Sequence, residues 1–140
     1  MHTLPIRSSI LLTTALVLLV GCGGGEPEGP PIGYVEGTVT LDGKPLKGVI
    51  VGFEPQGTTS GAPSMGATDA EGHYELTYSA SEKGAAIGTH KVTVTTPSDA
   101  PTPSGEEYVD PIPAKYNTAS ELIKEVKEGN NVLDLELTSQ

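Results

Sequence analysis

The chain has 140 residues, of which 18 are Asp or Glu and 8 are Lys or Arg, and its formal net charge at pH 7 is −10. This acidic balance excludes a basic surface that would bind nucleic acid, and the length allows one domain but hardly two. Cys22 is the single cysteine, which excludes an internal disulfide, so the stability of the fold must come from its hydrophobic core.

The first 21 residues have the layout of a secretory signal peptide. Arg7 is followed by an apolar run of 11 residues, from Ile10 to Val20. This run is shorter than the ~20 residues that a membrane-spanning helix needs. Glycines follow it at once, so we expect an export signal without a lasting membrane span.

The signal ends in Leu19-Val20-Gly21-Cys22, which resembles the lipobox of bacterial lipoproteins. The resemblance implies cleavage before Cys22, a diacylglycerol on its sulfur and a fatty acid such as palmitate on its new amino group. The alternative is a chance cysteine at the end of an ordinary secretory signal. Several acyl chains, each contributing about 0.8 kcal/mol per buried methylene, would anchor the protein stably to membrane lipid. The expected location is the cell envelope, at the periplasmic face of a membrane or at the cell surface.

Three parts are expected along the chain: a signal peptide at 1–21, a flexible Gly/Pro tether at 22–33, and one folded domain at 34–140. Removal of the signal would leave seven lysines, no arginine and all 18 carboxylates, a formal charge of −11. The tether has prolines and glycines and nothing to bury, which favours an extended conformation. The folded domain would therefore lie close to the membrane.

From Tyr34 onward, apolar residues recur at every second position, which is the period of a strand with one buried face. This alternation predicts five strands, at residues 35–41, 49–53, 73–78, 91–95 and 133–137, and a sixth short strand at 64–68. Asp-Gly at 42–43 and the segment 69–72 predict tight turns between them. Short strands at this spacing are typical of a sandwich or a barrel.

Two later stretches do not follow this pattern. Residues 96–113 contain five prolines, which cannot donate to a central ladder, so we expect a long surface loop. Residues 118–128 fit a helix capped by Thr118 or Ser120, and they also fit a strand, because Leu122 and Val126 share one parity. We favour the strand, since a sandwich needs an even closure of its sheets.

Two motifs, Gly37-Thr38-Val39 and Asp69-x-x-Gly72-x-Tyr74, lie within segments that resemble successive strands of a carboxypeptidase regulatory-like domain. These segments are 36–46, 68–76 and 88–94, and the whole resemblance covers roughly 34–137. It implies an all-β fold, a seven-stranded Ig-like or transthyretin-like antiparallel sandwich. Residues 112–131 also resemble the C-terminal part of small bacterial lipoproteins with this domain, a family without an assigned activity.

Few residues suggest chemistry. His73 and His90 are the histidines that remain after signal removal, and their spacing is not that of paired metal ligands, so we expect no metal site and no cofactor. We interpret His73 as a surface residue and His90 as a small aromatic that packs at the start of a strand. The acidic turn at Asp69 and Glu71 lacks the spacing of a calcium loop. We therefore interpret it as a solvated β-turn.

The leading hypothesis is a non-catalytic, lipid-anchored sandwich with a structural or interaction role in the bacterial envelope. Its expected partners are membrane lipid, bound through acylated Cys22, and an unidentified envelope protein or glycan. The main alternative is carbohydrate or peptide binding through the loop at 96–117. Its ligand contacts would be Tyr108 and Tyr116, because Tyr74 and Tyr78 lie on the expected core face.

A weaker alternative is a hydrolase built on the transthyretin scaffold, with His73 or His90 in its active site. Some transthyretin-like proteins are hydroxyisourate hydrolases, and they end in Tyr-Arg-Gly-Ser. This chain ends in Leu137-Thr138-Ser139-Gln140 instead, so the hypothesis of an enzyme rests on the scaffold alone.

Overall fold

The computed structural model describes Gly23, residues 29–97 and residues 110–140; Cys22 and Tyr108, two of the expected site residues, lie outside these ranges. The described chain is all-β, with two sheets and one 3-10 helix, η1 (Ala114–Tyr116). No helix in these ranges is long and apolar enough to cross a membrane.

The first sheet is built around the long strand β1 (Ile32–Leu41), which has neighbours along both of its edges. Along one edge, β2 (Lys44–Pro45), β5 (His73–Glu75) and β8 (Ala85–Ala86) pair with it in antiparallel orientation. Along the other edge, β11 (Asn130–Val132) and β12 (Leu135–Leu137) pair with it in parallel orientation. The expected antiparallel arrangement is therefore wrong for this edge, where the C-terminal strands run in the same direction as β1.

The second sheet has the order β10-β9-β3-β4-β6-β7, and all of its pairs are antiparallel. Its strands are β3 (Ile50–Pro55), β4 (Ser64–Ala67), β6 (Thr77–Ser79), β7 (Glu82–Lys83), β9 (Gly88–Thr95) and β10 (Ile123–Val126). The two sheets pack face to face around one apolar core, which makes the domain a β-sandwich. The buried core includes Val35, Val39, Val51, Phe53, Tyr74, Leu76, Val92, Val94, Leu135 and Leu137.

The described residues form twelve strand segments where seven strands were expected. The predicted strand at 73–78 divides at Leu76 into β5, which pairs with β1, and β6, which pairs with β4. The predicted strand at 133–137 becomes β12 alone, and β11 precedes it. Of the two possibilities for 118–128, the strand is confirmed by β10 at Ile123–Val126.

The proline-rich stretch differs from a simple surface loop where it returns to the sandwich. Ile112 is buried in the core. The Asp110 carboxylate accepts hydrogen bonds from the N–H of Thr96 at 3.0 Å, from its hydroxyl at 2.9 Å, and from the N–H of Ile112 at 2.9 Å. Asp110 therefore joins the two ends of the stretch and directs Ile112 inward.

Side chains replace part of the ladder between β1 and its parallel neighbours. Between β11 and β12, the N–H of Thr38 donates to Asp134 Oδ1 at 2.9 Å, and the Tyr74 hydroxyl donates to the carbonyl of Leu133. Gly37 permits this close approach, because a Cβ there would lie 2.3 Å from the Leu133 oxygen. This junction fixes where β12 begins.

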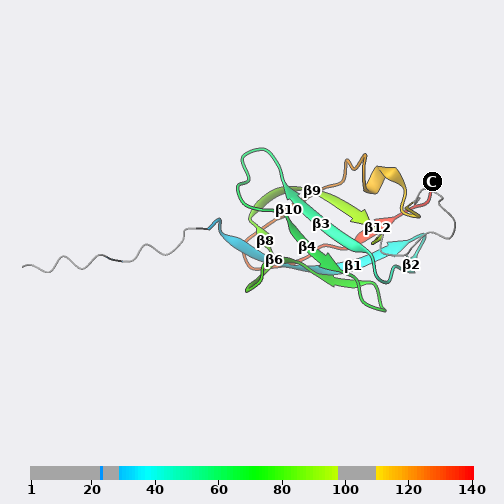
Figure 1. Ribbon diagram of the computed structural model, residues 1–140, viewed down its shortest axis with the longest axis horizontal. Helices are drawn as coiled ribbons and strands as arrows, with labels where there is room; N and C mark the ends of the chain where they lie inside the picture. The colour runs from blue at the N-terminus through cyan, green and yellow to red at the C-terminus, as the bar shows by residue number, and fades with distance from the viewer. Residues whose placement is uncertain (1–22, 24–28, 98–109) are drawn as a thin grey trace, which may run out of the picture.

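The chain enters the sandwich and leaves it at opposite ends (Figure 1). Residue Ile32 begins β1 at one end, and η1 and the C-terminus lie together at the other. Ile32 and Gly33 pair with β8, so the folded sheet begins within the range expected for the tether.

Candidate functional site

Tyr116 is the expected ligand-contact residue that the structure describes, and it is held firmly at the end of η1. Its hydroxyl oxygen accepts the N–H of Thr138 at 3.1 Å and lies 3.3 Å from the Thr138 hydroxyl. The Lys115 ammonium lies 5.1 Å from the centre of the Tyr116 ring, within the range of a cation–π contact. The hydrogen bonds with Thr138, followed by the charge of Lys115, hold the pKa of the Tyr116 hydroxyl below its usual value.

Tyr116 forms one wall of a pocket of about 400 Å³, which we call the Tyr116 pocket. Its other lining residues are Leu122, Lys124, Asp134, Leu135, Glu136 and Leu137. The volume falls in the range of ~300–1,000 Å³ that is usual for ligand sites, and such sites combine apolar walls with a few polar groups. The three leucines supply the apolar part of the lining, and the ionisable side chains supply the polar part.

Charges of both signs line the Tyr116 pocket. Lys124 comes from β10, on the second sheet, whereas Asp134 and Glu136 come from the C-terminal segment of the first sheet. Lys124 forms no ion pair with any other residue in the described ranges. Its ammonium is therefore available to a ligand, as are the carboxylate of Glu136 and the second oxygen of Asp134.

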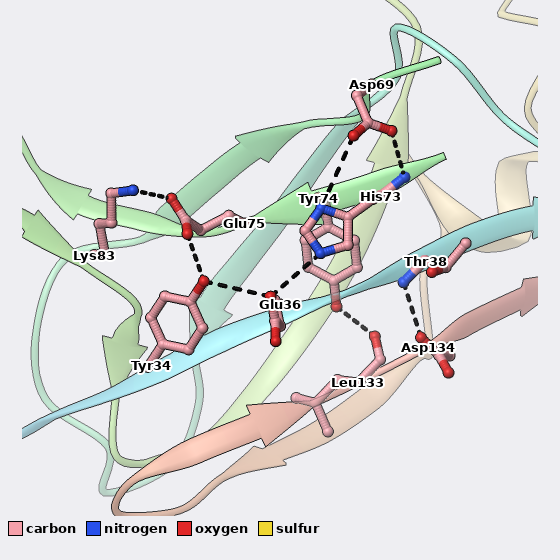
Figure 2. A network of polar contacts seen from close by, with 10 residues as sticks. All are labelled: Tyr34, Glu36, Thr38, Asp69, His73, Tyr74, Glu75, Lys83, Leu133 and Asp134. Carbon is pink, nitrogen blue, oxygen red and sulfur yellow. Dashed lines mark hydrogen bonds and ion pairs between the residues drawn. The ribbon is translucent and has the colours of Figure 1, made fainter. Parts of the chain in front are cut away.

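A separate network of polar side chains covers the outer face of the first sheet (Figure 2). Glu36 on β1 lies directly opposite Glu75 on β5, a pairing that like charges disfavour. The Tyr34 hydroxyl donates to Glu75 and lies 3.4 Å from Glu36, while Lys83 pairs with Glu75. His73 Nε2 lies 3.3 Å from Glu36. Each carboxylate thus has a neutral or cationic neighbour that offsets the repulsion.

Two groups in this network have pKa values that are shifted away from neutral pH: the pKa of Tyr34 is raised and that of Glu75 is lowered. The hydrogen bond with Glu75 is the main cause that raises the pKa of Tyr34 to about 12. The Lys83 ammonium, and then the Tyr34 hydroxyl, hold the pKa of Glu75 below its usual range. A general acid and base would be tuned toward neutral pH. Neither Tyr34 nor Glu75 is therefore tuned toward neutral pH.

The two histidines lie on different sheets, His73 on β5 of the first sheet and His90 on β9 of the second. His73 is exposed on the outer face, as expected, and its N–H donates to Asp69 Oδ1 at 2.9 Å, as does the N–H of Glu71 at 3.0 Å. The Asp69 carboxylate therefore closes the predicted turn. His90 is fully buried, with Nε2 2.7 Å from the carbonyl oxygen of Ala86 and its ring centre 5.7 Å from that of Phe53. The interpretation of His90 as a packing aromatic is confirmed.

Within residues 29–97 and 110–140, no group of three His, Cys, Asp or Glu side chains is arranged to hold a metal ion. Sequence reasoning identified Tyr116 because it is an aromatic residue near the long loop. It missed Lys124, Asp134 and Glu136. One signal in the sequence could have indicated Lys124. It shares the strand period of Leu122 and Val126, so it lies on the face of the strand that points inward.

No protein-family model matches this chain, and no curated protein matches it. A solved structure, that of a DUF3823 family protein from Parabacteroides merdae ATCC 43184, is similar to it with a TM-score of 0.42 and 18% sequence identity. The similarity covers 78% of this chain and 47% of that protein, so this chain spans about half the length of the protein it matches.

Proposed function

We propose that this protein is a lipid-anchored, non-catalytic β-sandwich of the bacterial cell envelope with an interaction role. The observation that supports it most directly is Leu19-Val20-Gly21-Cys22, which ends an export signal in the chain's single cysteine. The finer fold type that we propose is a transthyretin-like, carboxypeptidase regulatory-like domain. Its support is the order and spacing of the strand segments at 36–46, 68–76 and 88–94.

The geometry of β1 is suited to such an anchor. The chain enters the sandwich at Ile32, close in sequence to Cys22, and the Tyr116 pocket lies beside the partners of Val39 to Leu41. Val39 is seven residues beyond Ile32 on β1, and at about 3.3 Å per residue this separation is about 23 Å. An anchored domain would therefore present its pocket on the side away from its point of attachment.

Mass spectrometry of the membrane fraction tests the anchor. We expect a mature N-terminus at Cys22 that carries diacylglycerol and an amide-linked acyl chain. The variant Cys22→Ser is expected to lose the lipid and leave the membrane fraction, whereas the matched control Gly24→Ala keeps both. An unmodified Cys22 in mature protein, or membrane attachment of Cys22→Ser equal to that of the wild type, would reject the proposal.

A second candidate function is carbohydrate or peptide binding by the segment at 96–117. The observation that favours it is the place of Tyr116 in a pocket that three leucines and charges of both signs line. Glycan and peptide arrays probed with the full chain test it, and we expect binding that weakens at least fivefold in Tyr116→Ala and less in Tyr108→Ala. Arrays without binding, or hits that are indifferent to Tyr116→Ala, would reject it.

A further inference from the structure

The lining of the Tyr116 pocket shows that it lies along a strand edge. Four consecutive residues, from Asp134 to Leu137, contact it. Side chains of successive strand residues point to opposite faces of a sheet, and here Leu135 and Leu137 are buried while Asp134 and Glu136 are exposed. A space that contacts side chains from both faces of the sheet, one residue after the next, cannot lie on one face alone. It lies beside the strand, where main-chain groups point.

The main-chain hydrogen bonds show which residues of β12 face that space. The carbonyl of Leu137 accepts the N–H of Asp42 at 2.9 Å, so Leu137 faces β1. The next residue, Thr138, faces the other way and donates its N–H to Tyr116. Because the direction alternates along a strand, the N–H and C=O of Glu136 face away from β1. In the described part of the chain, β12 pairs with β1 alone, so this edge is open.

The opposite wall of the pocket belongs to β10, the edge strand of the second sheet, which supplies Leu122 just before it and Lys124 within it. An extended chain laid along β12 would continue the first sheet. Its inward side chains would contact Leu122, Leu135 and Leu137, and its outward side chains would lie beside the carboxylates of Asp134 and Glu136. Cross-strand pairs of opposite charge are favourable and like pairs are not.

We propose that the open edge of β12 binds an extended peptide by strand addition, with basic residues on its outward positions and apolar residues on its inward positions. Main-chain hydrogen bonds to Glu136 give affinity, and the two side-chain rows give selectivity. A second copy of this chain is a poor occupant, because antiparallel pairing of two such edges would bring the Asp134 and Glu136 carboxylates of both copies together. The proposal rests on the second candidate function and specifies the peptide as its ligand.

Fluorescence anisotropy tests the proposal with the full chain, purified in detergent, and a fluorescein-labelled hexapeptide of alternating lysine and valine. We expect saturable binding that is at least tenfold weaker for the same peptide N-methylated at every residue, because methylation removes its main-chain donors and leaves its charge unchanged. A glutamate–valine hexapeptide is expected to bind at least tenfold more weakly in low salt, because its outward glutamates would lie beside the carboxylates of Asp134 and Glu136, whereas Lys124 faces the inward row.

Glu136→Pro is the matched change in the protein. Proline is tolerated on an edge strand where the N–H faces outward, so this variant removes the proposed donor and keeps the bonds to β1. We expect at least a tenfold loss of affinity, against less than fivefold for Glu136→Ala, which keeps the N–H. Circular dichroism checks that both variants fold. If Glu136→Pro does not fold, the N-methylated peptide still tests the same main-chain hydrogen bonds.

Several results would overturn the proposal. These are no saturable binding of the lysine–valine peptide, equal binding of its N-methylated form, or wild-type affinity in folded Glu136→Pro. A molecular mass that falls to the monomer value in Glu136→Pro would show that the occupant is a second copy. Array binding of glycans alone, lost in Tyr116→Ala, would reject the peptide but leave the second candidate function intact, and the state of Cys22 is measured independently of both.

Discussion

Replacement of Gly37 by alanine tests the junction that positions β12. A Cβ at this position would lie 2.3 Å from the oxygen and 2.7 Å from the carbon of the Leu133 carbonyl, and 3.0 Å from a ring carbon of Tyr74. Non-bonded carbon atoms pack best at about 3.5–4.0 Å. Two of the three contacts involve main chain, so no side-chain rotation relieves them. The segment at 133–134 must move away from β1.

The cost has two parts. Overpacking of a filled core costs about 1–3 kcal/mol. Movement of Leu133 also breaks its hydrogen bond with the Tyr74 hydroxyl, and a buried polar group left without a partner costs about 1–3 kcal/mol. We therefore expect Gly37→Ala to lower the free energy of unfolding by about 2–6 kcal/mol, a large share of the ~5–15 kcal/mol that holds a typical domain together.

Urea unfolding of the full chain, followed by far-ultraviolet circular dichroism, measures this change. Gly29→Ala is the control, because a Cβ there meets no atom within 4 Å, and its unfolding midpoint should match the wild type. If the loss runs through the Tyr74 hydrogen bond, then Gly37→Ala and Tyr74→Phe should be less than additive in a double-mutant cycle. A Gly37→Ala midpoint equal to that of the control would refute the close approach at this junction.

Three further changes have expected outcomes. Tyr74→Phe leaves the Leu133 carbonyl without its partner and should cost about 1–2 kcal/mol in urea unfolding, whereas Tyr78→Phe, whose hydroxyl accepts a single exposed N–H at 3.3 Å, should cost less than about 0.5 kcal/mol. Because the pKa of Glu75 is lowered in the folded state, its contribution is present above its usual value of 4.5 and is lost as the pH falls through the folded value; the stability gap between wild type and Glu75→Gln should therefore narrow as the pH falls below 4.5, and a gap that is independent of pH would contradict this. Asp110→Ala removes three hydrogen bonds and should lower the melting temperature more than Asp110→Asn; equal melting temperatures of the wild type and Asp110→Ala would show that this carboxylate does not hold the loop ends.

The burial of the central strands could be predicted from the sequence, because each strand has one face in the core and one in solvent. Val35 and Val39 on β1, and Val92 and Val94 on β9, alternate with polar residues and are fully buried. The alternation of apolar and polar residues in the sequence thus corresponds to the buried and exposed faces of each sheet. The strand at 118–128 followed from the need to close the sandwich and not from its own composition.

Pairing partners could not be predicted in the same way. Residues 73–78 have one continuous alternation, yet β5 pairs with the first sheet and β6 with the second. Hydropathy reports which side chains are buried, but it does not report the strand with which each segment pairs. The change of sheet depends on contacts with residues outside this segment, such as the hydrogen bond from the N–H of Leu76 to the carbonyl of Val35 and that from the N–H of Gly84 to the carbonyl of Leu76.

The Tyr116 pocket could not be predicted from the sequence either. Its main feature is the open edge of a strand, whereas hydrophobic periodicity indicates only which face of a strand is buried. In the sequence, Asp134 and Glu136 resemble ordinary exposed positions of an alternating strand. They can be recognised as pocket residues only once β12 is known to pair along one edge. The parallel pairing with β1 depends on Gly37, Tyr74 and Asp134, which lie far apart in the sequence.

The two edge strands that border the pocket are protected to different degrees. Natural sheets discourage unwanted pairing with charges that point inward from an edge strand, and Lys124 on β10 is such a charge. The inward residues of β12 are Leu135 and Leu137, both buried, and neither opposes the addition of a strand. Tyr116 satisfies one N–H at the end of this edge, at Thr138, and thereby limits the length that a guest strand can occupy. The selectivity of β12 must then reside in its outward carboxylates, which favour a basic peptide and disfavour a second copy of this acidic chain.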